Sequence, residues 1–126
     1  IYSLAWADEF SKYAQDRGVG SCKVYSSIEE LCKNVDAVCI FAPNFARVEI
    51  MQAIADAQKA GAGLKGVIVE KPLGRTVAEA QQLVDLAKAA GTPTAYFENQ
   101  IHMKGINAAL AQLAPRQVQA VDCQWQ

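Results

Sequence analysis

Residues 66–72 read Gly-Val-Ile-Val-Glu-Lys-Pro, an apolar run that ends in a carboxylate, an ammonium and a proline. The run has the length of a strand, and a capped helix is predicted to begin near Thr76. In open α/β sheets, ligands bind at the carboxyl ends of the strands. Glu70 and Lys71 are therefore predicted to lie side by side at a ligand-binding edge.

A second apolar run, residues 36–42, ends in Pro43 and Asn44 and is predicted to point at the same edge. Because this run is continuously apolar, we expect it to be covered on both faces, as parallel strands are. The two strand ends together predict one shared site.

Strand patterns alternate with helix patterns along the rest of the chain. Further strands are predicted over residues 22–25, 94–97 and 118–125. Helices are predicted from apolar spacing, capping boxes and terminal glycines over residues 4–16, 28–33, 47–60, 77–90 and 104–113. Alternating elements of this kind indicate βαβ units, an α/β fold and a mainly parallel sheet.

The composition is that of an ordinary globular domain, with 126 residues, 52% apolar residues and a formal charge of −1. No basic patch suggests a nucleic-acid partner. The apolar runs are about 5 to 8 residues long, whereas a membrane-spanning helix needs about 20, so no membrane association is predicted.

Four cysteines, Cys22, Cys32, Cys39 and Cys123, show no C-x-x-C spacing. Reduced thiols are the expected state, which favours a cytoplasmic location. The sequence opens at Ile1 without methionine and stops within an alternating stretch. We therefore expect it to be an internal piece of a longer protein.

A literal G-x-G-x-x-G occurs at residues 61–66. The dinucleotide fingerprint must follow a strand and open a helix, so that the amino terminus of the helix faces the pyrophosphate. These glycines follow a predicted helix and open a predicted strand, so we interpret them as a helix-to-strand turn.

Other polar residues are weaker candidates. Asp8 and Glu9 could hold ribose hydroxyls, although acids early in a helix also complement its dipole. Residues 1–3 are predicted to be the tail of a strand, so Ser3 lies nearer a strand tip and is the better candidate. The single histidine, His102, has no partners at ligand spacing, so no metal site is predicted. We expect His102 at the surface, with a pocket role as the alternative.

Two other interpretations of Lys71 must be considered. Lysine is usually a solvated surface charge. A lysine followed by proline after a strand also occurs in receiver domains of two-component signalling, but a receiver needs an acceptor aspartate at the tip of its middle strand. Here Phe41-Ala42-Pro43 stands in that position, so the receiver hypothesis is disfavoured.

Several segments together resemble the glucose-fructose oxidoreductase / inositol dehydrogenase (Gfo/Idh/MocA) family. They are residues 25–31 (YSSIEEL), 35–38 (VDAV), 42–44 (APN), 69–74 (VEKPLG) and the helix through Gly91. The resemblance implies an amino-terminal Rossmann domain that binds NAD or NADP, followed by an α/β substrate domain. By it, residues 1–100 are a partial Rossmann domain that lacks its first strand, and residues 101–126 begin the substrate domain.

The resemblance also implies roles for individual residues. Pro43 and Asn44 would line the nicotinamide ribose, and Glu70 would accept hydrogen bonds from ribose hydroxyls. Lys71 would reach the nicotinamide and the reacting substrate oxygen, and Pro72 would shape the turn, with a cis bond as one option.

Four more residues complete the predicted site. Arg47, where the family often has histidine, and Ser3 are assigned to the cofactor, and Asn99 and Gln100 to the substrate. The family's glycine fingerprint would lie before residue 1, and its catalytic aspartate and histidine after residue 126.

The function implied is that of an NAD(P)-dependent oxidoreductase, present here as a fragment. It would transfer hydride between nicotinamide and a sugar, polyol or related alcohol or carbonyl. The alternative is a non-catalytic binding or regulatory protein of the same fold. A small-molecule substrate is expected, a homo-oligomer is left open, and the 126-residue chain alone is expected to be inactive.

Overall fold

The computed structural model describes residues 4–120 and 122. It divides into two compact units, one running through Tyr96 and the other beginning at Phe97. Each unit is described by itself.

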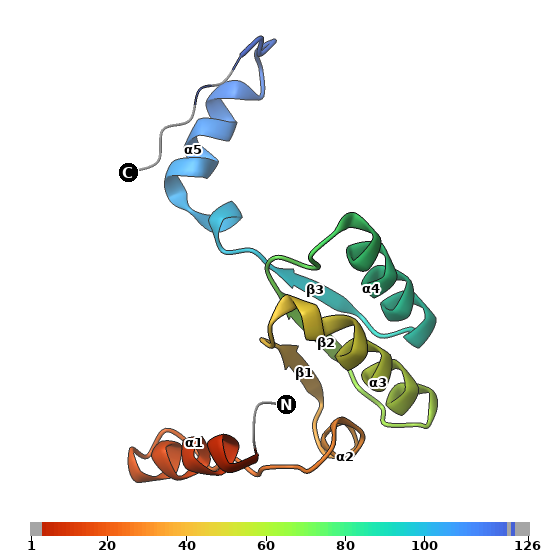
Figure 1. Ribbon diagram of the computed structural model, residues 1–126. Coiled ribbons are helices and arrows are strands. Elements are labelled where there is room, and N and C mark those ends of the chain that lie inside the picture. Colours follow the sequence, from red (N-terminus) through yellow and green to blue (C-terminus); the bar gives the residue numbers. More distant parts are fainter. Residues whose placement is uncertain (1–3, 121, 123–126) are drawn as a thin grey trace. The chain divides into compact units, whose positions relative to one another are not determined.

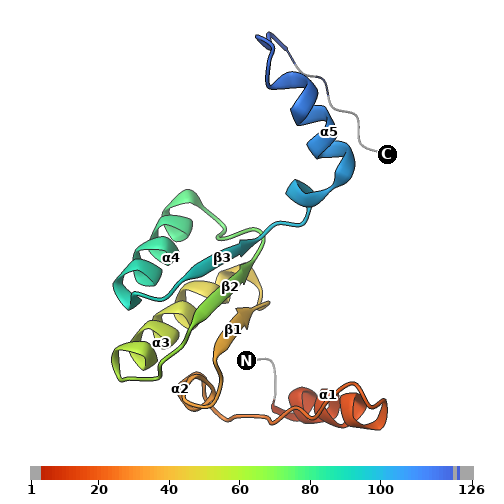
Figure 2. The ribbon, with the colours of Figure 1, turned by 180° about the vertical axis from the view of Figure 1, so that it is seen from behind.

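The first unit is built on a three-stranded sheet of β1 (Ala37–Ile40), β2 (Gly66–Glu70) and β3 (Thr94–Phe97). The strands lie in the order β1-β2-β3, and Figures 1 and 2 show their arrows pointing the same way. β1 and β2 pair in parallel, with Ala37 opposite Gly66 and Ile40 opposite Val69. The α/β class and parallel sheet are confirmed.

Two helices, α3 (Arg47–Lys59) and α4 (Val77–Ala90), lie on the same face of the sheet (Figures 1 and 2). Met51 and Ile54 of α3 pack with Val67 of β2 in the core, where all three are almost completely buried. Burial of this apolar surface stabilises the unit at about 25 cal/mol per Å².

The expectation that residues 36–42 are covered on both faces is wrong for this structure. Val38 and Ile40 are buried, while Ala37 and Cys39 are exposed. Successive side chains of a strand point to opposite faces, and both α3 and α4 cover the same one.

The remaining helices of the first unit are α1 (Leu4–Asp16), α2 (Ile28–Cys32) and the short η1 (Asn44–Ala46). In the second unit, η2 (Gln100–His102) precedes α5 (Lys104–Leu113), which has no buried residue. The predicted bounds of α1 and α5 are confirmed, and the other three α-helices match within one residue. Within the described ranges, no helix combines the length and hydropathy needed to cross a bilayer.

The strand predicted over residues 22–25 is not observed, since these residues carry no regular structure. A strand exists only where its backbone pairs with a neighbour, and alternation in the sequence cannot supply one. The Cys22 carbonyl instead accepts a hydrogen bond of 2.5 Å from the Ser11 hydroxyl. Of the strand predicted over 118–125, residues 118–120 and 122 are irregular and the rest lie outside the described residues.

Candidate active site at the ends of β1 and β2

The carboxyl ends of β1 and β2 meet, as the sequence predicts, and one side chain joins them. Arg47, the first residue of α3, donates from Nε to the Ala42 carbonyl at 2.8 Å. Its Nη1 donates to the carbonyls of Glu70 and Pro72, and its Nη2 to the Lys71 carbonyl at 3.3 Å. The connection after β1 and the turn after β2 are therefore within reach of a single guanidinium.

Three polar side chains at this edge have no partner among the residues that the structure describes. Lys71 is exposed, and Glu70 and Asn44 are half-buried. Over the described part of the chain, none of the three side chains makes a hydrogen bond or ion pair. An ammonium, a carboxylate and an amide are thus available at this edge for a polar ligand.

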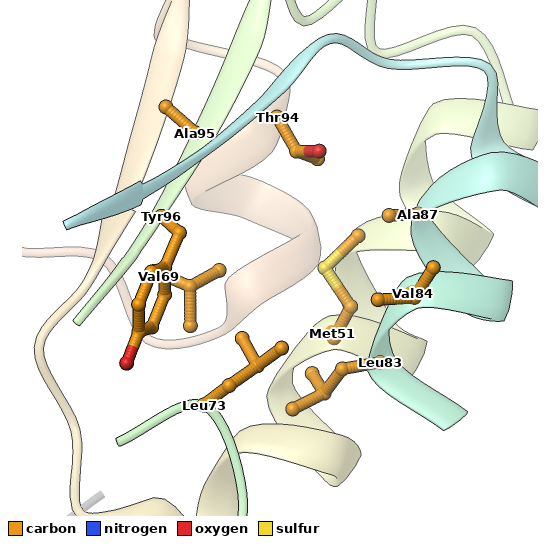
Figure 3. A pocket seen from close by; sticks show the side chains of 9 residues that line it. All are labelled: Met51, Val69, Leu73, Leu83, Val84, Ala87, Thr94, Ala95 and Tyr96. Atoms are coloured by element: carbon orange, nitrogen blue, oxygen red, sulfur yellow. The ribbon is translucent and has the colours of Figure 1, made fainter. Parts of the chain in front are cut away.

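The turn after β2 is anchored by apolar packing as well as by Arg47. The Lys71–Pro72 peptide bond is cis, which is the option that the sequence analysis left open. Leu73 packs against the core and lines an apolar pocket with Val69 and Leu83 (Figure 3). The backbone that carries Lys71 is therefore held on two sides.

This apolar pocket is not the candidate cofactor site. Its volume is about 120 Å³, below the roughly 300–1,000 Å³ of most ligand pockets. Its walls are formed by α3, α4, β2 and β3, and Figure 3 shows mostly hydrocarbon side chains around it. The pocket provides apolar contacts that hold Leu73 of the turn, and its walls offer few polar groups that would bind a dinucleotide.

The glycine motif at residues 61–66 lies where the sequence analysis placed it. α3 ends at Lys59, and Gly66 opens β2. Gly61 and Gly63 have φ values of 93° and 74°, which glycine adopts without steric cost. The motif is a turn between a helix and a strand, and that it does not touch the cofactor stays a prediction.

The remaining candidates take no part in the hydrogen bonds around Arg47. Asp8 and Glu9 are exposed on α1, and Ser3 lies outside the described residues. Asn99, Gln100 and His102 belong to the second unit and are exposed. Across the residues that can be described, no three His, Cys, Asp or Glu side chains are grouped to hold a metal ion.

Three thiols can be placed, and all are free. Cys22 and Cys39 are exposed, whereas burial raises the pKa of the Cys32 thiol. Cys32 therefore behaves as a small apolar residue of the core. Cys123 lies outside the described residues.

Sequence reasoning missed the carbonyl cluster around Arg47. One signal was present. A cation at the start of a helix opposes the helix dipole, so Arg47 directly before an apolar helical face called for a compensating set of acceptors.

Comparison with protein families matches residues 7–97 to the Gfo/Idh/MocA oxidoreductase family, with its NAD-binding Rossmann fold. The match covers well over half of the chain. The chain belongs to this family. The resemblance in residues 25–91 is thereby confirmed.

Solved structures of this fold include an NAD-binding oxidoreductase from Klebsiella pneumoniae. It is 27% identical, with a TM-score of 0.66 over 91% of this chain and 28% of its own. Myo-inositol 2-dehydrogenase from Lactobacillus plantarum is 20% identical, with a TM-score of 0.65 over 82% of this chain and 30% of its own.

Biliverdin reductase from Synechocystis sp. PCC 6803, solved with biliverdin and NADP+, is 24% identical. Its TM-score is 0.61 over 82% of this chain and 30% of its own. The chain thus spans less than a third of each of these structures. The comparison with curated proteins gave no significant match.

Proposed function

We propose that this family member is an NAD(P)-dependent oxidoreductase and that the edge formed by β1 and β2 binds the nicotinamide end of the cofactor. The substrate class is a sugar, polyol or related alcohol or carbonyl. The observation that carries the proposal is that Lys71, Glu70 and Asn44, at two adjacent strand ends, have no side-chain partner within the described part of the chain. These groups suit the hydroxyls, amide and reacting oxygen of a nicotinamide nucleoside and an alcohol.

When bound, the cofactor supplies a carbon that accepts or gives hydride. Lys71 would stabilise charge on the substrate oxygen as hydride moves, because an ammonium fixed beside a developing oxyanion lowers the barrier. The Glu70 carboxylate would accept hydrogen bonds from ribose hydroxyls, and Pro43 and Asn44 would line the ribose. Pro72 would shape the turn and meet the cofactor there.

The remaining predicted site residues are assigned as follows. Ser3 is proposed as a cofactor contact, and Asn99 and Gln100 as substrate contacts. Arg47, which the sequence analysis assigns to the cofactor, is proposed to act through the turn after β2 instead, because it is buried and its guanidinium donates to backbone carbonyls. Residues 1–100 would form the cofactor-binding part and 101–126 the start of the substrate domain, close to the division between the compact units at residues 96 and 97. A cytoplasmic location suits the exposed free thiols of Cys22 and Cys39.

The test is replacement of Lys71 by Ala in the complete protein, including whatever segments its gene encodes around this chain. Turnover would be followed by the absorbance of reduced nicotinamide over a panel of polyols and sugars that includes myo-inositol. We expect Lys71→Ala to lower kcat by about 10²–10⁴-fold, the range for a lost acid-base or charge-stabilising group.

Lys65 provides a matched control. It is an exposed lysine just before the opposite end of β2, and its ammonium lies 2.7 Å from the Asp36 carboxylate. Lys65→Ala should leave kcat unchanged. A Lys71→Ala protein within about threefold of wild type would refute the catalytic role. Dinucleotide binding without turnover of any panel member would favour the non-catalytic alternative.

A further inference from the structure

Arg47 is a buried cation in an unfavourable position. Its residue exposure is only 3%, and it is the first residue of α3. Moving an ion out of water carries a large desolvation cost, and the positive end of the helix dipole repels a cation. Over the described ranges no carboxylate forms an ion pair with it. Backbone carbonyls must therefore offset these costs.

The acceptors are concentrated on one short segment. A guanidinium carries five N–H groups in a rigid planar fork, and Arg47 uses four of them on carbonyls. Three of the four acceptors are the consecutive carbonyls of Glu70, Lys71 and Pro72. The fourth, Ala42, belongs to the neighbouring connection after β1.

We propose that Arg47 is a positioning residue that fixes the position of the Lys71 side chain. The proposal rests on the proposed function, because it presumes that Lys71 acts on the substrate. Arg47 donates to the carbonyl of Lys71 and to the carbonyls of the residues on both sides of it. The position of the guanidinium therefore fixes the position of the backbone that carries the Lys71 ammonium. Its link to Ala42 also holds this turn in register with the segment that carries Pro43 and Asn44.

Fork geometry is essential to this role. Lysine keeps the charge but presents three N–H groups from a single nitrogen, which cannot reproduce a planar array of acceptors. Methionine keeps the apolar stem and removes every donor. Arg47→Lys and Arg47→Met therefore separate charge, geometry and packing.

The experiment compares these variants with Ile54→Ala in the complete protein. Ile54 is fully buried on the same helix. Its replacement by Ala, like the replacement of Arg47, therefore removes side-chain atoms from the interior. Four quantities would be measured well below the melting temperature of each protein. They are kcat and KM with an active member of the polyol panel, the Kd for NAD(H) and NADP(H), and hydrogen–deuterium exchange over residues 68–76.

We expect Arg47→Met to lower kcat by about 10- to 100-fold, since a misplacement near 1 Å can cost that much. Dinucleotide Kd should change by less than about threefold, and exchange over residues 68–76 should rise. Arg47→Lys should recover part of kcat. Ile54→Ala should lower the melting temperature yet keep kcat within about threefold.

Several outcomes would overturn the inference. One is a kcat of either Arg47 variant as high as that of Ile54→Ala. Another is a raised dinucleotide Kd at unchanged kcat, which would mark Arg47 as a direct cofactor contact. If Arg47→Met does not fold, Arg47→Lys decides. A failure of the proposed function is visible separately, because Lys71→Ala would then retain activity whatever the Arg47 variants do.

Discussion

Gly74 shows how one residue lets the turn after β2 reach α4. A Cβ built on Gly74 would lie 2.9 Å from both the Ala80 amide nitrogen and the Glu79 Cβ. Real Cβ atoms essentially never approach other atoms so closely, and one of these neighbours is backbone. Glycine is therefore required at position 74, because the turn approaches the first turn of α4 too closely for a side chain.

We predict that Gly74→Ala destabilises the protein by about 1–3 kcal/mol, the usual cost of overpacking a well-packed site. Denaturant unfolding would measure the change. Gly105→Ala is the matched control, because a Cβ at that position on α5 meets nothing within 4 Å. Equal stability of the two variants would show that the turn moves aside freely.

At the scale of elements, α2 and α4 begin in the same way. The Thr76 hydroxyl accepts from the Glu79 amide at 3.2 Å, and the Ser27 hydroxyl accepts from the Glu30 amide at 3.1 Å. In a capping box the glutamate returns to the backbone amide of the cap residue. Here Glu79 accepts from the amide of the preceding residue, Arg75, at 2.8 Å. The caps are confirmed with this shift of one residue.

The Glu79 carboxylate is therefore a pH-dependent part of the α4 cap. Hydrogen bonds from the Arg75 side chain and backbone hold the pKa of Glu79 below its usual value of 4.5. A carboxyl whose pKa is lower when folded stabilises the protein above its unfolded pKa and loses that effect as pH falls through the folded value.

We predict that Glu79→Gln lowers the melting temperature at pH 7 and that the difference from wild type shrinks below pH 4.5. Thermal melts across pH would measure it. Thr76→Ala is the control, since loss of its hydroxyl should cost about 1 kcal/mol with little dependence on pH. A Glu79→Gln difference that stays constant with pH would contradict the assignment.

At the scale of the molecule, the described sheet has helices α3 and α4 on one face, while Cys39 on the other face of β1 is exposed. Between residues 4 and 120 no strand leads through a glycine-rich turn directly into a helix in the way that cradles a pyrophosphate. On the proposed function, the edge with Lys71 would therefore bind the nicotinamide end of the dinucleotide and leave the pyrophosphate without its helix amino terminus.

We therefore predict that the 126-residue chain expressed alone is poorly soluble or partly unfolded and does not saturate with NAD(H) or NADP(H) at millimolar concentration. Exposed strand edges and apolar faces favour association. Fluorescence titration and a thermal melt of the isolated chain would test this. Micromolar affinity together with a cooperative transition would contradict it.

Local signals in the sequence determined the elements and the two strand ends of the candidate site. Caps at Ser27 and Thr76, the αL glycine at Gly91 and the apolar spacing of α3 act within a few residues, so they can be read without the fold. The parallel β1–β2 pair then followed from the alternation of strands and helices.

Only the tertiary structure decided what depends on partners distant in the chain. Residues 22–25 have a strand-like pattern but no hydrogen-bonded partner strand. Cys39 is exposed because α3 and α4 both pack on the opposite face of the sheet. Arg47 donates to carbonyls 23 to 25 residues away. Hydrogen bonds and burial across such separations are set by which segments meet, and no local pattern encodes that.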